Sequence, residues 1–580
     1  MPSPLLVFYR FRDQNTTPAI PGYFAVSTAP DNVEDPEYNN PLVHAGILDG
    51  VELFNDSPEV IIRQIAADLE AANQGAEPAE LVIAIHGYNT DLTSAKDRHL
   101  DTWRYANRHI SAKNAVFLGY RWPSEQVRLN GKTLKNVVTS LPVLLSTFLG
   151  AGILGIVLLF TVHSLLVTLI SSVAVFLAII TIALMLLRVS GYFRDSYRAT
   201  NFGVPDLVEL VRQLDQAVEN LHIQQAEQAG QLYDAKNFRR IKLNFIAHSM
   251  GGFVTTNVLR ILSDVFDRKS IGTIAGFEKA PDSDLGNVFR LGRLVLVAPD
   301  IPFTAIMLRR ANFLKSSLRR CEEAYLFSNE GDLALRIAST AANYFSYPTS
   351  SREWGHRLGN VTVRPMKKAK DPQYGIVNGA ELAANPLQVK LLHYLEINTL
   401  TKPVSLQQLE KEDNPDEESI ANLFTYFDCT DYVDVKDGTQ GRPTNILSYR
   451  LDRDLVSNTI AYIRLLISWM SGKIDTHGGY FNGKLTKDMI YRLAFLGFQD
   501  YLKTIADPSL FTEPMLRELD QSGQVIPLLQ EFSALCASKR IQIALSPERY
   551  LVDVMGKEPT AVRTATLQAQ PEVHQPELKE

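Results

Sequence analysis

A serine flanked by small residues stands where an apolar run of the sequence changes to a helical pattern. The run Ile241–Ile246 predicts a strand, and the spacing of apolar residues in Phe253–Leu262 predicts a helix. Between them, Ser249 lies two residues after Ala247 and two residues before Gly251. A strand, a tight turn of this kind and a helix form a nucleophile elbow, which holds a serine hydroxyl clear of the sheet. Ser249 is therefore the candidate nucleophile for acyl transfer.

A glycine-containing turn follows an earlier predicted strand, Leu81–Ile85. Attack on a carbonyl carbon creates an oxyanion that two backbone N–H groups can stabilise. In sites built on an elbow, one donor follows the nucleophile and the other lies in a turn after an earlier strand. These donors would be Met250 and Tyr88, and an ordinary strand-end turn is the alternative interpretation. The residues expected to support the site are His86, Gly87, His248 and Gly251.

The other two members of a catalytic triad must follow the serine in the order acid, then histidine. The predicted strand Glu323–Ser328 is followed by Asp332, whereas Asp300 ends the strand before it. The acid usually follows the second strand after the nucleophile helix, so Asp332 is favoured and Asp300 is the alternative. A histidine base needs a loop that can present its ring, and His356 and His477 both lie in glycine-containing turns. The residues alone leave both histidines open.

Several short motifs of the chain resemble one family. They are His86-Gly87-Tyr88-Asn89-Thr90, Trp122-Pro123-Ser124, Tyr192-x-x-Asp195, His248-Ser249-Met250-Gly251 and Ala298-Pro299-Asp300. Together they are similar to the α/β-hydrolase family of unknown function numbered 900, over about Leu81–Gly359. The resemblance implies an α/β-hydrolase fold with Asp332 as the acid. It also favours His477 as the base, because His477 opens a His-x-x-Tyr-Phe string that resembles the family's final histidine motif.

The order of the elements predicts an α/β fold with a mostly parallel sheet flanked by helices. Leu81–Ile85 and Ala115–Tyr120 are apolar strands with a helical segment, Ser94–His109, between them, which is the repeating unit of a parallel sheet. Val204–Leu221 has apolar residues at helical spacing, and Leu387–Glu396 also has helical character.

A long apolar segment interrupts this pattern. No Asp, Glu, Lys or Arg occurs from Asn136 to Leu187. One helix of that length would reach roughly 78 Å, against about 30 Å for the hydrocarbon core of a bilayer, so two passes are expected, at about Leu141–Thr161 and Leu165–Leu187. Basic residues flank both ends of the run, which predicts a hairpin with both ends in the cytoplasm. We therefore expect an integral membrane protein of a bacterial-type inner membrane, and the alternative is a helical hairpin buried in a soluble core.

Six segments are expected along the chain. They are residues 1–135, the N-terminal part of the hydrolase domain; 136–189, the transmembrane hairpin; 190–365, the core with the elbow and the acid; 366–455, an insertion of unclear role; 456–555, the catalytic histidine loop and C-terminal helices; and 556–580, a disordered tail.

The composition excludes several other classes of protein. The 580 residues have a formal net charge of −6 and no basic block, so nucleic acid is not an expected partner. The three cysteines, Cys321, Cys429 and Cys536, are far apart, which argues against a disulfide framework or a cysteine-built zinc site. No metal or organic cofactor is expected. The sequence thus predicts a membrane-anchored serine hydrolase acting on an ester or thioester of a small molecule or lipid, and the alternative is a non-catalytic membrane scaffold or interaction protein with the same fold.

Overall fold

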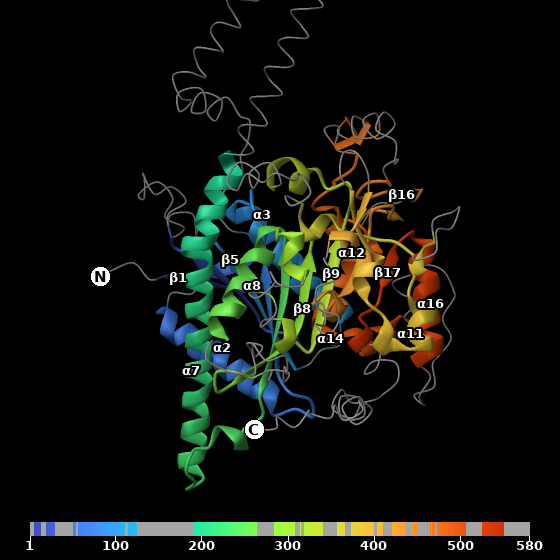
Figure 1. The fold of residues 1–580 in the computed structure, drawn as a ribbon. Helices are drawn as coiled ribbons and strands as arrows, with labels where there is room; N and C mark the ends of the chain where they lie inside the picture. Colours follow the sequence, from blue (N-terminus) through green and yellow to red (C-terminus); the bar gives the residue numbers. More distant parts are fainter. Residues whose placement is uncertain are drawn as a thin grey trace, which may run out of the picture.

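The computed structural model of the protein is built around one large β-sheet (Figure 1). It describes residues 5–12, 19–29, 50–53, 56–110, 114–124, 190–263, 284–307, 314, 318–339, 356–365, 373–398, 403–409, 420–436, 442–450, 461, 464–465, 467–469, 473–505 and 525–549. The strands of the sheet are β1 (Leu6–Phe11), β2 (Gly22–Ser27), β3 (Val51–Leu53), β4 (Glu80–Ile85), β5 (Ala115–Arg121), β6 (Ile241–His248), β7 (Asp284–Leu285), β8 (Phe289–Val297), β9 (Glu323–Ser328), β11 (Gly375–Ile376), β14 (Thr425–Asp428) and β17 (Gln542–Ala544). Their order across the sheet is β11-β17-β14-β9-β8-β6-β4-β5-β2-β1-β3, with β7 beside β8.

The middle of the sheet is parallel. From β2 through β5, β4, β6, β8 and β9 to β14, each strand runs parallel to its neighbour. Antiparallel pairs occur towards the two ends, where β1 pairs with β2 and β17 pairs with β14. The chain goes from β4 outward to β5 and then returns past β4 to β6, so the strand order reverses between β4 and β6. In open α/β sheets, ligands bind beyond the carboxyl ends of the strands at such a reversal.

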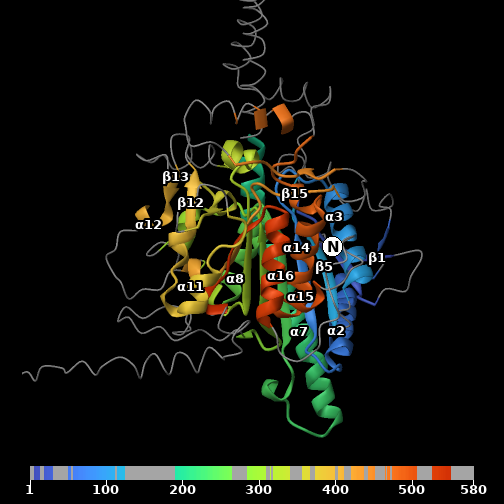
Figure 2. The same cartoon turned by 90° about the vertical axis from the view of Figure 1, so that its right-hand side faces the viewer.

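Helices cover both faces of this sheet (Figures 1 and 2). One layer contains α2 (Pro58–Asn73), α7 (Val204–Gln228) and α8 (Met250–Leu262), and the other contains α3 (Leu92–His109), α14 (Lys484–Leu496), α15 (Phe498–Thr504) and α16 (Val525–Ser538). Parallel strands are joined by right-handed crossovers, so connections that run in opposite directions along the sheet lie on opposite faces. This explains why α3, which follows β4, and α7, which precedes β6, belong to different layers.

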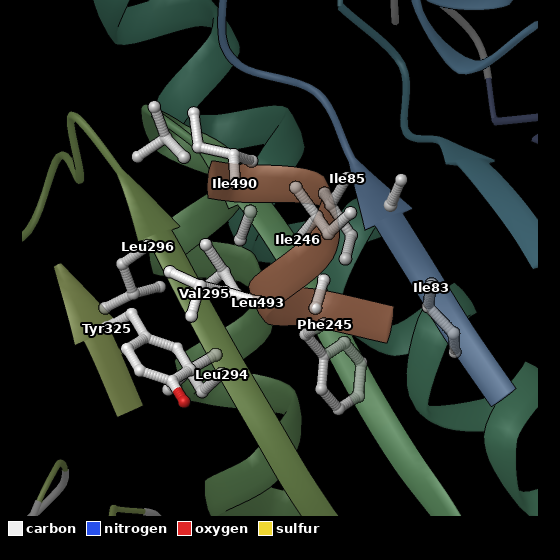
Figure 3. Close-up of a cluster of buried hydrophobic side chains, with 14 of the residues drawn as sticks. Ile83, Ile85, Phe245, Ile246, Leu294, Val295, Leu296, Tyr325, Ile490 and Leu493 are labelled. Atoms are coloured by element: carbon white, nitrogen blue, oxygen red, sulfur yellow. The ribbon is translucent and has the colours of Figure 1, made fainter. Parts of the chain in front are cut away.

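The core between sheet and helices follows from two simple patterns. Strand β4 is buried along its whole length, as expected for a continuous apolar strand covered on both faces. Helix α7 buries Leu207, Leu210, Val211, Leu214 and Val218, which recur at helical spacing along one face. On the other side, Ile490 and Leu493 of α14 lie against side chains of β4, β6 and β8 (Figure 3). This packing fixes the central strands whose carboxyl ends carry the candidate site.

The predicted elements around the elbow are present, and one predicted helix is wrong. The strands and helices expected within 81–120 and 204–262 all form, with ends shifted by a few residues. Residues 387–396 instead form 3₁₀ turns at Pro386–Gln388 and Leu391–Tyr394, followed by β12 (Leu395–Asn398). Strand β12 pairs with β10 (Thr362–Val363) and β13 (Pro403–Ser405) in a small second sheet. A short apolar run does not separate strand from helix, and here pairing with neighbouring strands decided the outcome.

Three other predicted segments have different outcomes. Residues 366–455, expected as an insertion of unclear role, contribute β11 and the last parallel strand, β14, to the main sheet. The predicted membrane hairpin at 136–189 lies outside the described residues, as does the predicted tail at 556–580. Within the described part of the chain, no helix combines the length and the apolar character needed to cross a membrane.

Candidate active site

Ser249 occupies a sharp turn between β6 and α8. Its backbone has φ 55° and ψ −124°, a conformation that residues other than glycine rarely adopt. Three backbone hydrogen bonds hold this strained residue, because its N–H donates to Val297 O at 2.9 Å and its carbonyl accepts from the N–H groups of Gly252 at 2.9 Å and Asp300 at 3.0 Å. The Ser249 Oγ is buried and has no hydrogen-bond partner among the described residues. Strain held by the surrounding structure around an unpaired hydroxyl is typical of a functional residue.

The turn at Ser249 lies directly against the end of β4. A Cβ atom added at Gly251 would come within 2.6 Å of the His86 carbonyl oxygen and 2.8 Å of that of Ile85. A Cβ atom added at Gly87 would come within 2.7 Å of the Ser249 Cβ. Both glycines are therefore required by close approach, as expected from the sequence, and the loop after β4 touches the candidate nucleophile.

Hydrogen bonds fix the backbone of this loop next to Ser249. Trp122 Nε1 donates to the His86 carbonyl at 3.0 Å, and His86 Nδ1 lies 2.7 Å from the Gly87 carbonyl oxygen, to which it can donate. The C=O and N–H of one trans peptide point in opposite directions, so His86 sets the direction of the Tyr88 N–H. On the other side of Ser249, Met250 is the first residue of α8, where backbone N–H groups have no partner within the helix. Met250 thus follows Ser249 directly, and Tyr88 follows Gly87, which lies against Ser249.

His477 and Asp332 form a hydrogen-bonded pair. Nδ1 of His477 lies 2.7 Å from Oδ2 of Asp332, and Oδ1 of Asp332 accepts from the Leu335 N–H at 3.0 Å. The Asp332 side chain is fully buried. Because Nδ1 faces the acid, Nε2 is the nitrogen left for proton transfer, and it is buried without a partner among the described residues. Ser249 Oγ and His477 Nε2 are not hydrogen-bonded to each other here, and such catalytic bonds often tighten only when substrate binds.

His248 connects the histidine loop to the elbow. Its ring lies 4.7 Å from the His477 ring between centroids, and its Nε2 lies 3.1 Å from the His477 carbonyl oxygen. Its Nδ1 lies 3.0 Å from Nη1 of Arg98, which can only donate. Burial first, and then the Arg98 charge, lower the pKa of His248 well below its ordinary value. A neutral His248 therefore accepts from Arg98 and donates to the His477 carbonyl, which fixes the loop that carries His477.

The charge of Asp332 distinguishes His477 from His86, the buried histidine of the loop after β4. Burial alone would lower the pKa of His477, but the charge and hydrogen bond of Asp332, with smaller contributions from Asp475 and Asp300, raise it above 6.5. The pKa of His86 is lowered well below its ordinary value, mainly by burial. An imidazole with a raised pKa beside a carboxylate can accept and hold a proton, which is the property that a general base needs.

The two alternative residues take other places in the structure. His356 is buried, and burial together with the nearby Arg336 lowers its pKa to about 3. Its Nδ1 has no hydrogen-bond partner among the described residues, so no described carboxylate holds that nitrogen. Asp300 forms a 3.0 Å ion pair with Nε of Arg357. Within the described part of the chain, the structure therefore joins Asp332 to Nδ1 of His477, leaves Nδ1 of His356 without a partner, and gives Asp300 a cationic partner of its own.

Several residues around the site had no role in the sequence prediction. Asn329 Nδ2 donates to the Thr476 carbonyl at 2.8 Å, and the Leu333 N–H donates to Thr476 Oγ1 at 3.3 Å, so the acid loop and the histidine loop are held together. Asp475 accepts from the His477 and Gly478 N–H groups, which shapes the histidine turn. An Asp two residues before His-Gly is a turn signal that the sequence did offer. In the described part of the chain, no three His, Cys, Asp or Glu side chains are grouped as a metal ion would require.

Comparison with known proteins supports the family resemblance over part of the chain. Residues 225–346 match a family model described as an alpha/beta hydrolase of unknown function (DUF900). This segment contains β6, the elbow, β8, β9 and Asp332. Searches of curated proteins and of solved structures found no match. The match and the mostly parallel sheet flanked by helices agree on a hydrolase-like α/β fold, and neither identifies a substrate.

The close approach at Gly251 predicts that even one added methyl group disturbs the site. In Gly251→Ala, the new Cβ must displace backbone of the His86 loop, which cannot move as a flexible side chain does. We expect the rate at which a fluorophosphonate labels Ser249 to fall about 100-fold, since a displacement near 1 Å can cost that much. Gly379→Ala is the matched control, because its added Cβ meets only the Ile376 side chain at 3.4 Å. Equal labelling of both variants would contradict the geometry.

The raised pKa of His477 predicts the pH dependence of Ser249 reactivity. The base acts as neutral imidazole, so labelling should fall about tenfold per pH unit below a pKa that lies above 6.5. The same shift contributes stability that is complete below the ordinary histidine pKa and is lost as pH rises through the raised one. Reactivity is thus gained in the pH range where this stability is lost. Asp332→Asn should move the acid limb of the labelling profile to lower pH, and an unmoved limb would show that another group titrates.

Proposed function

We propose that the protein is a membrane-anchored serine hydrolase that cleaves an ester or thioester through an acyl-enzyme. The observation that carries this proposal is the Asp332–His477 hydrogen bond, in a loop that His248 joins to the strained turn of Ser249, whose Oγ has no partner among the described residues. Acyl transfer by a serine requires these three groups. Ser249 follows β6, Asp332 follows β9, and His477 lies in the segment before α14.

The reaction follows from the role of each group. Ser249 Oγ forms a bond to the carbonyl carbon while its proton passes to His477 Nε2, and the Met250 and Tyr88 N–H groups stabilise the oxyanion. The carbon–leaving-group bond then breaks as His477 returns the proton to the departing oxygen or sulfur. Water attacks the acyl-enzyme, its proton goes to His477 and then to Ser249 Oγ, and the carboxylic acid leaves. Asp332 keeps the imidazole in the productive tautomer throughout.

The position of the segment before Ser190 supports membrane anchoring and a lipid or acylated substrate. The described residues before 125 and after 189 lie next to each other, because Ser124 Oγ donates to Asp195 Oδ2 at 2.9 Å. A segment that crossed the bilayer once would separate its two ends by about 30 Å, whereas a hairpin brings them together. The Asn89 N–H also donates to Asp195, so the described residues on both sides of 125–189 lie beside the loop after β4. An acyl chain from the bilayer would then have a short path to Ser249.

The test of the proposed function is active-site labelling of the full-length protein in detergent. A fluorophosphonate should label the wild type but not Ser249→Ala. His477→Ala should lower labelling and the turnover of a short-chain aryl ester by several orders of magnitude, because the base is removed. His356→Ala, a substitution at a buried histidine without a carboxylate partner, should keep most of the turnover. Folding of each variant is checked by thermal unfolding.

The pattern of results separates the alternatives. Folded wild type that no probe labels would favour the non-catalytic membrane scaffold. Labelling that survives His477→Ala but is lost in His356→Ala would move the role of base to His356 and leave the hydrolase proposal intact.

The hairpin is expected to anchor the protein without building its site. Replacing residues 139–189 with a short Gly/Ser linker should release protein from carbonate-washed membranes and keep turnover of the aryl ester within a few fold. The physical reason is that Ser124 and Asp195 join the two ends of the segment independently of what lies between them. Wild type that carbonate itself extracts would contradict the anchor, and a folded but inactive linker variant would show that the hairpin contributes to the site.

A further inference from the structure

Asp195 is a buried carboxylate bonded to the loop after β4. Its side chain is fully buried, and Oδ2 accepts hydrogen bonds from the Asn89 N–H at 2.8 Å and from Ser124 Oγ at 2.9 Å. Arg194 lies 2.9 Å from Oδ1, and Arg198 lies 3.7 Å from it. A buried carboxylate is retained only with such partners, because removing them leaves it unpaired and strongly destabilises the fold. The charge on Asp195 is therefore available to hold neighbouring backbone.

The peptide between Tyr88 and Asn89 is held at both of its polar groups. Thr90 Oγ1 donates to the Tyr88 carbonyl at 3.2 Å, and the Asn89 N–H donates to Asp195. Asn89 has φ 56°, a backbone conformation that costs energy outside glycine and needs support from its surroundings. Holding this peptide restricts the backbone of Tyr88 on the side away from His86.

Ser124 completes a set of bonds around the same loop. Its Oγ accepts from the Thr90 N–H at 3.1 Å and donates to Asp195, and its side chain is fully buried. Asp195 and Ser124 thus hold the N–H groups of two consecutive loop residues, Asn89 and Thr90. We name Ser124 and Asp195 the loop clamp. His86 and Trp122 fix the loop from the upstream side, and the loop clamp fixes it from the downstream side.

We propose that Asp195, acting with Ser124, is a positioning residue that holds the Tyr88 N–H in place to stabilise the oxyanion. This inference rests on the proposed hydrolase function. An oxyanion donor stabilises the transition state only if it is fixed in advance, because a donor that must reorganise during the reaction loses much of its effect. Among the described residues, no hydrogen bond or ion pair joins the loop clamp to Ser249 or His477, so we expect it to act on the oxyanion donor and not on the titration of the base.

The experiment compares Asp195→Asn and Ser124→Ala with a control carboxylate in the full-length protein. Asp215 is the matched control, because its oxygens also accept backbone N–H groups, those of Val288 at 2.9 Å and Asn287 at 3.4 Å, at the start of β8, away from the elbow. Asp195→Asn should lower kcat for a short-chain aryl ester about 10- to 100-fold, below the 10²–10³-fold loss on removing an oxyanion donor outright. KM and the acid limb of the pH profile should not move. Ser124→Ala should show a smaller loss of the same kind, and Asp215→Asn should keep kcat.

Each outcome shows whether Asp195 positions the oxyanion donor or only stabilises the fold. If Asp195→Asn and Asp215→Asn lower the unfolding temperature equally and have equal kcat values, the positioning role of the loop clamp is wrong. The proposed hydrolase function would not be affected. A shifted acid limb would also overturn the positioning role, since the effect would then pass through His477. If Asp195→Asn does not fold, Ser124→Ala decides by the same two readouts. Wild type that neither turns over the ester nor is labelled by the fluorophosphonate would overturn the proposed function and this inference together.

Discussion

The contact between the turn at Ser249 and the end of β4 is the constraint on which the site depends. Backbone hydrogen bonds hold the strained turn, and the loop after β4 packs against it so closely that no room is left for a Cβ atom at Gly87 or Gly251. Such proximity requires β4 and β6 to be parallel neighbours with their carboxyl ends aligned, as the pairing of Ile85 with Ala247 shows. The reversal of strand order therefore comes first, and the positions of nucleophile and donors follow from it.

Electrostatics then selects one histidine from several. His86, His248 and His356 are all buried, and burial is the largest influence that lowers the pKa of each. Only His477 among these four has a carboxylate at Nδ1, so only there does an opposite charge outweigh burial. Among these four histidines, His477 is therefore the one whose protonated form the structure favours. Neutral His86 and His248 each donate to a backbone carbonyl, and protonation of His248 would remove the bond that its Nδ1 accepts from Arg98.

The features that could be predicted from the sequence are those that local residue patterns determine. The elbow, the glycines and the strands β4, β5, β6, β8 and β9 follow from local apolar runs and turn residues, and Asp332 follows from chain order. The strand β14 has only Thr425–Asp428 to identify it, and its place beside β9 depends on long-range pairing. The same holds for Asn329 with Thr476 and for Asp195 with Asn89, whose partners are more than 100 positions away. Local periodicity carries no information on such polar contacts.

Those long-range contacts explain how the site keeps one geometry although long segments of the chain separate its residues. Asp332 and His477 are separated by 145 positions. The Asn329–Thr476 and Leu333–Thr476 hydrogen bonds join the two ends of the intervening segment next to this pair. Ser124 and Asp195 join the ends of the other long segment next to the oxyanion loop. Lengthening such a segment costs little, because loop entropy grows only with the logarithm of length. Buried polar bonds at each point of departure therefore let the chain acquire long segments while the geometry around Ser249 stays the same.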